Sequence, residues 1–183
     1  IKHPDFPEMA KVKVVMDDAV GKTDLKAFVA IAVNRKGQRI SYQSGKAIWT
    51  EQEMVTSDHV FRIFSMTKLL TSISAMQLVE QGKVRLDEDL SYLLPEMSEI
   101  PILTDSGLVN GRNPITLRHL LTHTAGFGSV FTDKALSEFK KDNWKYKDLP
   151  RRFESGTRFL YGTNTYWVGK LVERLSGISL EEY

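Results

Sequence analysis

The hydrophobic pattern at the start of the chain is that of an amphipathic helix. Residues 8–20 carry apolar side chains at the three-to-four spacing of one helical face. These positions are Met9, Val12, Val15 and Met16. Gly21 follows directly, and glycine commonly ends a helix because it adopts the left-handed conformation needed there. We therefore expect a helix over residues 8–20.

Two segments with the pattern of β-strands come next. Residues 25–33 form a short apolar run interrupted only by Lys26, whereas residues 39–44 alternate apolar and polar side chains. Between them, Asn34-Arg35-Lys36-Gly37 is typical of a turn. The pattern predicts an antiparallel hairpin whose first strand is buried on both faces. Because an isolated two-stranded sheet is marginally stable, we expect further strands to complete it.

From Phe64 onward the apolar spacing is helical. The longest helical segment begins at Phe64 and ends at Gly82, with apolar side chains at Leu69, Leu70, Ile73, Met76 and Val79. Shorter helices are expected over 89–94, 116–122, 133–141 and 163–175. Pro95 is expected to stop the first of these, because proline cannot continue a helix.

The order of these segments predicts a mixed α/β protein in two parts. Residues 1–55 would form the N-terminal helix and first strands of an α/β domain, and residues 56–183 a helical domain. The run Ser179-Leu180-Glu181-Glu182 has the pattern of a capping box, which opens a helix. We therefore expect a C-terminal segment, in the same chain or as a separate fragment, to complete the fold.

Composition narrows the functional class. With 42% hydrophobic residues the chain can form a core, and 25 basic against 23 acidic residues give a net charge of only +2, which argues against nucleic-acid binding. No apolar run approaches the roughly 20 residues that a membrane-spanning helix needs. The absence of cysteine excludes disulfides and thiol nucleophiles. Localisation stays open.

The tetrad Ser65-Met66-Thr67-Lys68 is the first candidate for catalysis. Its i, i+3 spacing puts a serine hydroxyl and a lysine amine on one face of a helix, where a neutral amine can take the serine proton. The same tetrad recurs as Ser137-Glu138-Phe139-Lys140 in a charged segment, where a solvated helix face is the simpler interpretation. Ser65 precedes the most apolar helix, so we expect buried surroundings for it.

Tyr161 is the second candidate. It lies between a turn at Ser155-Gly156 and the helix expected from residue 163. A phenol there can relay a proton between nucleophile and leaving group if a neighbouring cation lowers its pKa. Taken alone, a buried tyrosine with a satisfied hydroxyl is the simpler interpretation.

Four segments together resemble the serine β-lactamase-like superfamily, which includes the penicillin-binding proteins. They are SMTK at 65–68, GKVRLDEDLSYLLPE at 82–96, ITLRHLLTHTAGF at 115–127 and ESGTRFLYGTNTYWVGKLVERLSG at 154–177. The similarity is greatest to family VIII carboxylesterases. The resemblance implies an antiparallel sheet flanked by helices with a helical domain attached, of which this chain is the N-terminal part. It also implies that Ser65 is acylated, Lys68 is its base and Tyr161 is a second base or proton relay.

The chain departs from the pattern of that superfamily in two places. The β-lactamases and peptidases have Tyr-x-Asn, whereas Gly162 and Thr163 follow Tyr161 and Asn164 comes one residue late. No predicted strand carries the third motif, Lys/His/Trp-x-Gly, because Trp167-Val168-Gly169 falls in the helix expected over 163–175; the strand with that motif would supply one of two oxyanion-hole N–H groups.

These observations favour a serine ester hydrolase acting on a small-molecule ester or amide. The alternatives are a class C-type β-lactamase or D-alanyl-D-alanine peptidase, and an inactive β-lactamase-like binding domain. We expect no metal, organic cofactor, nucleic-acid partner or membrane. His119 and His123 are spaced like a zinc motif, but Leu120 occupies the position of its glutamate.

Overall fold

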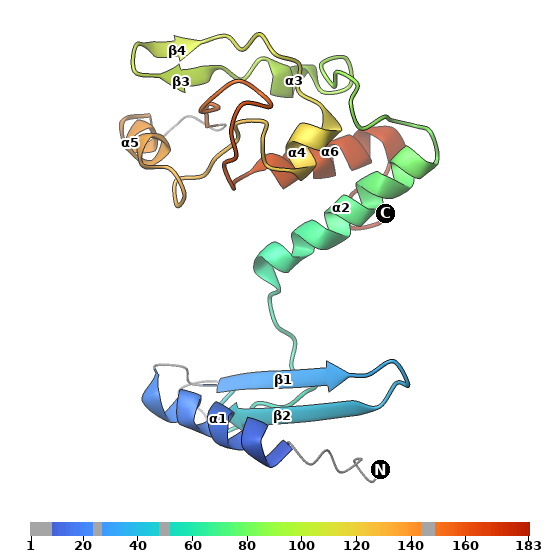
Figure 1. The fold of residues 1–183 in the computed structure, drawn as a ribbon, viewed down its shortest axis with the longest axis vertical. Helices are drawn as coiled ribbons and strands as arrows, with labels where there is room; N and C mark the ends of the chain where they lie inside the picture. The colour runs from blue at the N-terminus through green and yellow to red at the C-terminus, as the bar shows by residue number, and fades with distance from the viewer. Residues whose placement is uncertain (1–8, 24–26, 48–51, 144–148) are drawn as a thin grey trace. The chain divides into compact units, whose positions relative to one another are not determined.

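The computed structural model describes residues 9–23, 27–47, 52–143 and 149–183. The chain forms two compact units, residues 1–62 and 63–183, whose elements are labelled in Figure 1. None of the helices in the described ranges is long and apolar enough to cross a membrane. The division of the fold between residues 55 and 56 stays a prediction.

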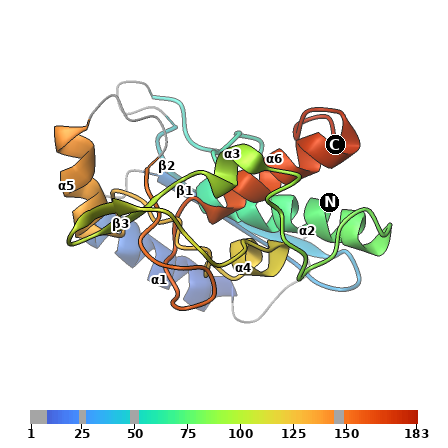
Figure 2. The same cartoon turned by 90° about the horizontal axis from the view of Figure 1, so that it is seen from above.

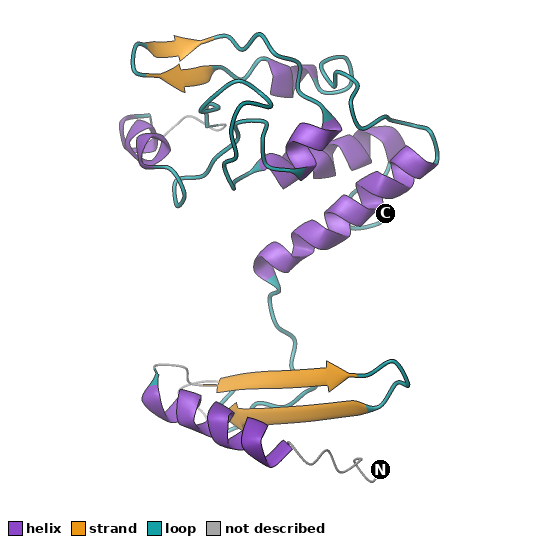
Figure 3. Cartoon of the chain, viewed as in Figure 1, coloured by secondary structure: helices purple, strands orange, loops and turns teal. Residues whose placement is uncertain are grey.

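The first unit consists of a helix and an antiparallel hairpin, as the pattern predicts (Figure 3). Helix α1 (Met9–Lys22) is followed by strands β1 (Ala27–Val33) and β2 (Arg39–Gly45), with Ala27 opposite Gly45 and Val33 opposite Arg39. The side chain of Asn34 accepts hydrogen bonds from the backbone of Lys36 and Gln38, which closes the turn. The Tyr42 hydroxyl donates to Asp17 and so links β2 to α1.

The first strand is not buried on both faces among the described residues. Ile31 and Val33 are 48% and 63% exposed, and residues 27–30 are half-buried. The prediction is wrong here because α1 and β2 are the elements packed beside β1 in this unit, and they leave its far end open.

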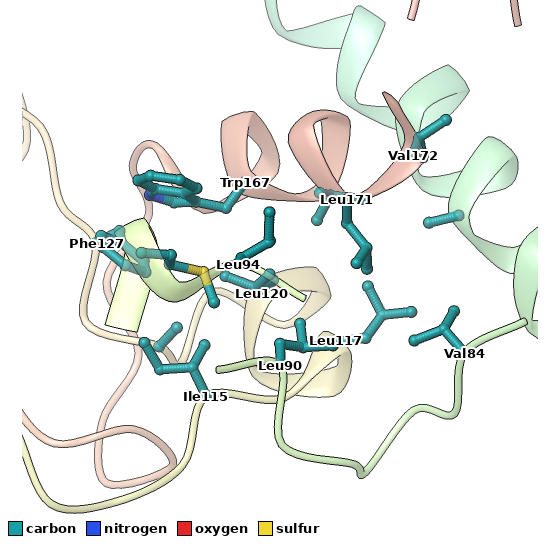
Figure 4. Packing of buried hydrophobic residues seen from close by; sticks show 14 of the residues in the cluster. Val84, Leu90, Leu94, Ile115, Leu117, Leu120, Phe127, Trp167, Leu171 and Val172 are labelled. Atoms are coloured by element: carbon teal, nitrogen blue, oxygen red, sulfur yellow. The ribbon is translucent and has the colours of Figure 1, made fainter. Parts of the chain in front are cut away.

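The second unit is built around three helices. The 3₁₀ helix η1 (Phe64–Met66) leads into α2 (Thr67–Glu80), which packs against α6 (Asn164–Ser176), as Figure 1 and Figure 2 both show. Helix α4 (Leu117–Leu121) packs on α6 from another side. Figure 4 shows the apolar core between these elements, and its fully buried members include Leu90, Leu94, Leu117, Leu120 and Leu171. The helix predicted over 133–141 is confirmed as α5 (Lys134–Asp142).

Two features of the second unit differ from the prediction. Residues 89–94 form no helix but a turn at 91–93, and the short helix α3 (Pro95–Ser98) begins at the proline that was expected to stop a helix. Proline suits the first helical position because its missing N–H would have no partner there. A second hairpin, β3 (Ile102–Thr104) with β4 (Gly107–Val109), was not predicted, because three-residue strands are too short to show a period.

Candidate active site

The Ser65 tetrad lies where η1 passes into α2. One helical turn separates Ser65 from Lys68, so the two side chains share a face. Lys68 Nζ donates to Ser65 Oγ at 3.1 Å. At this distance a neutral amine could accept the serine proton directly.

Tyr161 reaches the same oxygen from 96 residues away in the sequence. Its O–H donates to Ser65 Oγ at 2.8 Å, and Lys68 Nζ lies 5.0 Å from the centre of its ring. The hydrogen bond with Ser65, and then the hydrogen bond and positive charge of Lys68, lower the pKa of the Tyr161 phenol from its ordinary value. The structure thus brings the three predicted residues into one cluster that can pass a proton.

The backbone around Tyr161 is held by neighbours that the sequence did not single out. Thr132 Oγ1 donates to the Tyr161 carbonyl at 2.8 Å. Gly162 is buried, and a β-carbon at that position would lie 2.4 Å from the carbonyl oxygen of Phe127. Tyr161 is therefore followed by glycine because a side chain would displace the backbone of 127–128. Thr132 lies in no recognisable motif, so no sequence signal could have found it.

Asn164 is turned into the protein. It is fully buried, and its Nδ2 donates to the Phe127 carbonyl at 2.7 Å. Thr163 is exposed instead, with its hydroxyl donating to the Gly128 carbonyl at 3.3 Å. A fully buried amide cannot bind a substrate beside Ser65.

The surroundings of Ser65 are not buried, contrary to the prediction. Ser65 is exposed, Lys68 is half-buried and Leu69 is 65% exposed. Helix α2 points Thr71, Ala75 and Leu78 into the unit, and these are its buried residues. Its opposite face, which we call the open face of α2, stays exposed and consists of Leu69, Leu70, Ile73 and Met76.

The second tetrad, Ser137 to Lys140, lies on α5 with Ser137 half-buried. The Tyr161 hydroxyl donates a hydrogen bond to Ser65, and this contact distinguishes the Ser65 tetrad from the Ser137 tetrad.

His119 and His123 face different partners. His119 accepts from the Thr116 backbone N–H at 3.4 Å and completes the capping box of α4. His123 Nδ1 lies 3.0 Å from Asn164 Nδ2. Within the described ranges no three His, Asp or Glu side chains are grouped so as to hold a metal. His123 touches the cluster around Ser65, a contact that its zinc-like spacing did not predict.

Comparison with known sequences finds one family and several relatives. The family model described as Beta-lactamase matches residues 24–183. The acyltransferase calJ of Penicillium decumbens is 42% identical over an alignment of 144 positions, and the match covers 69% of this chain and 34% of the relative. The lovastatin esterase of Penicillium rubens is 34% identical over 152 residues, 73% of this chain and 38% of the relative. This chain thus spans about a third of the length of such relatives.

Solved structures agree with the family match. The unliganded simvastatin synthase LovD from Aspergillus terreus superposes with a TM-score of 0.81 at 33% identity, and the match covers 98% of this chain and 50% of LovD. The resemblance extends over both units, and the fold is the mixed α/β fold that the sequence predicts.

Proposed function

The chain belongs to the β-lactamase family, and from that premise we propose that the protein is a serine ester hydrolase that forms an acyl-enzyme on Ser65. One observation carries the proposal: Ser65 Oγ accepts hydrogen bonds from both Lys68 and Tyr161, at 3.1 and 2.8 Å. In this scheme Lys68 is the base for acylation and Tyr161 is the second base or proton relay.

The proposed reaction has two balanced halves. Ser65 Oγ attacks the ester carbonyl carbon and gives its proton to Lys68, while the departing alcohol oxygen takes a proton relayed through Tyr161. The acyl group now rests on Ser65. Water then attacks the same carbon, loses a proton to the Lys68–Tyr161 pair and releases the acid, and Ser65 Oγ regains its proton. No step of this route calls for a metal or an organic cofactor.

Acyl transfer to an alcohol is a second candidate, favoured by the printed names of the relatives. Both calJ and a monacolin J acid methylbutanoyltransferase of Aspergillus terreus, each 42% identical, are named for acyl transfer. The two activities share the acyl-enzyme and differ in what attacks it. Adding an alcohol acceptor to the hydrolysis assay and measuring the ratio of new ester to free acid distinguishes them.

β-Lactamase and peptidase activity remain the weaker alternatives, because Asn164 is buried and Thr163 stands in its place. Losing one hydrogen bond to a substrate amide costs about 1–3 kcal/mol, or roughly 10- to 200-fold in rate. We expect short-chain p-nitrophenyl esters to have a far higher kcat/KM than nitrocefin. The opposite order would exclude the esterase proposal.

A non-catalytic binding domain is the alternative from another class. The complete protein is treated with a fluorophosphonate probe, and the adduct is located by mass spectrometry. We expect labelling at Ser65, loss of labelling in Ser65→Ala and unchanged labelling in the matched control Ser137→Ala. An adduct at Ser137, or no adduct at all, would contradict the proposal.

We also propose that the complete protein carries a C-terminal segment that covers the open face of α2 and supplies the second oxyanion N–H. Two observations support it: Leu69 and Leu70 are 65% and 57% exposed, and this chain matches only half of LovD. Removing one oxyanion donor typically costs about 10²–10³ in kcat. The substrate, a small-molecule ester or amide, would bind between that segment and Ser65.

A further inference from the structure

We propose that His123 is a positioning residue that holds the Tyr161 ring where its hydroxyl reaches Ser65. The inference rests on the proposed function, in which Tyr161 relays the proton. The ring centres of His123 and Tyr161 are 4.7 Å apart, with an angle of 41° between the ring planes. The imidazole therefore packs directly on the phenol and limits how far it can tilt from Ser65 Oγ.

The backbone of His123 is fixed to the segment that carries Tyr161. The Leu160 N–H donates to the His123 carbonyl at 2.9 Å, one residue before Tyr161. His123 has a φ of +56°, a left-handed conformation that is uncommon for a residue with a side chain. It lies two residues beyond α4, whose Leu117 and Leu120 are fully buried, so the core determines where this carbonyl lies.

Asn164 fixes the orientation of the His123 ring. Its Nδ2 donates to the carbonyls of Phe127 and Leu160, at 2.7 and 3.4 Å. Two carbonyl oxygens can face only the amino end of an amide, so the direction of the Asn164 side chain is determined. An amide amino group has two protons and accepts none, so the proton that does not go to Phe127 is shared between the Leu160 carbonyl and His123 Nδ1, which lies closer, at 3.0 Å, and accepts it. The proton of His123 then resides on Nε2, and the ring is neutral.

The charges around His123 favour the same neutral state. Among the described residues, Lys68 of α2 and Tyr161 are titratable groups that face it, and the Phe159 ring packs edge-to-face with it at 6.1 Å between ring centres. Burial, and then the charge of Lys68, lower the pKa of His123. An imidazolium would turn an N–H toward the amino group of Asn164 and add a second cation near Lys68. A neutral aromatic ring can support Tyr161 without this repulsion.

A double-mutant cycle in the full-length protein tests the role. His123→Asn removes the ring, while asparagine tolerates the left-handed backbone. We expect kcat on a p-nitrophenyl ester to fall about 10- to 100-fold with little change in KM, because a small displacement of a catalytic group costs that much. In a Tyr161→Phe background, His123→Asn should cause no further loss of kcat. The rate of fluorophosphonate labelling of Ser65 gives a second readout where turnover is slow.

The controls separate positioning from folding. His123→Phe keeps a ring of similar size and should retain more activity than His123→Asn. If His123→Asn fails to fold, His123→Gly replaces it in the cycle, because glycine also tolerates the left-handed backbone. An unchanged kcat in His123→Asn, or an equal loss with and without the Tyr161 hydroxyl, would overturn the proposal. A Tyr161→Phe variant with full activity would instead contradict the relay in the proposed function, and that result is visible in the single variant alone.

Discussion

Lys68 and Tyr161 both donate hydrogen bonds to Ser65 Oγ, and the pKa of Tyr161 depends on Ser65 and Lys68. The hydrogen bond with Ser65, together with Lys68, lowers the pKa of Tyr161 below the roughly 10 of a free phenol. A lowered pKa means that the phenolate, the form that accepts a proton, is populated at lower pH. Activity that needs this phenolate therefore rises as the pH rises through the lowered pKa and is lost below it.

Replacing Ser65 should move that titration upward. In Ser65→Ala the largest contribution to the shift is removed, so we expect the pKa of Tyr161 to rise toward its ordinary value. The measurement is the ultraviolet absorbance of phenolate as a function of pH, with a Tyr161→Phe variant subtracted to isolate one tyrosine. Ser137→Ala serves as the control and should not alter the curve. Identical titrations in Ser65→Ala and the parent protein would refute this account of the shift.

Gly162 should tolerate no side chain. A β-carbon there would lie 2.4 Å from the Phe127 carbonyl oxygen and the Gly128 backbone, neither of which can move alone. We expect Gly162→Ala to lower the free energy of unfolding by about 1–3 kcal/mol, as overpacking typically does, and to reduce kcat by displacing Tyr161. Thermal unfolding and ester hydrolysis measure the two effects.

Gly169→Ala in α6 is the matched control for that substitution. Its β-carbon would meet the end of the Leu180 side chain at 3.0 Å and Thr71 Cγ2 at an ordinary contact distance of 3.9 Å, and alanine is the better helix former. Stability should stay within about 1 kcal/mol of the parent. Equal destabilisation by both substitutions would show that the close approach at 127–128 is not the cause.

The contacts of single residues were only partly predictable from the sequence. Lys68 could be paired with Ser65 because one helical turn fixes their separation. Tyr161 could be assigned to the site of Ser65 only because the sequence around it resembles a known motif. No local rule connects residues 96 positions apart. The contacts of Thr132 and His123 with Tyr161 could not be predicted for the same reason, since they arise only after the chain folds.

At the scale of elements, capping side chains decide where the short helices of the second unit begin. Thr116 accepts from the His119 N–H at the start of α4, and Asp133 accepts from the Leu136 N–H at the start of α5. Because a capping residue can be recognised by its residue type alone, the first residues of both helices could be predicted from the sequence. Pro95 was misread because proline is compatible both with the end of one helix and with the start of the next.

Asp133 should stabilise α5 by two separable contacts. Its carboxylate caps the helix and also accepts from Arg152 Nε at 3.0 Å, with both side chains largely buried. Asp133→Ala removes both contacts, whereas Asp133→Asn keeps the cap, which is worth about 1 kcal/mol. Denaturant titration should show the larger loss of unfolding free energy in Asp133→Ala. Equal losses would mean that the cap contributes nothing measurable.

At the scale of the whole molecule, the open face of α2 is an apolar surface that the described residues leave exposed. Ile73 and Met76 are 49% and 42% exposed on a helix whose other face is fully buried at Ala75 and Leu78. Exposed apolar faces of this kind are normally covered in a soluble protein. The amphipathic pattern predicted a helix here, but it could not predict which of two apolar faces meets the unit's own core.

Introducing a charge should have different effects on the exposed and on the buried face of α2. Expressed alone, residues 1–183 are expected to self-associate, and Ile73→Glu should reduce that association without unfolding the second unit. In the full-length protein the same substitution should lower stability and activity, because we propose that a further segment covers this position. Ala75→Glu, on the buried face, should unfold both forms. Size-exclusion chromatography and circular dichroism provide the measurements, and a full-length Ile73→Glu protein with parental stability would argue against the proposed cover.

The 96-residue separation of Ser65 and Tyr161 also bears on how the protein is made. At a ribosomal rate of about 5–20 residues per second, Ser65 is added to the chain roughly 5–20 seconds before Tyr161. During that interval the nascent chain carries a serine without its phenol partner, so it should be chemically inert toward cellular esters. The nucleophile would gain its phenol partner only once the second unit has been synthesised and folded.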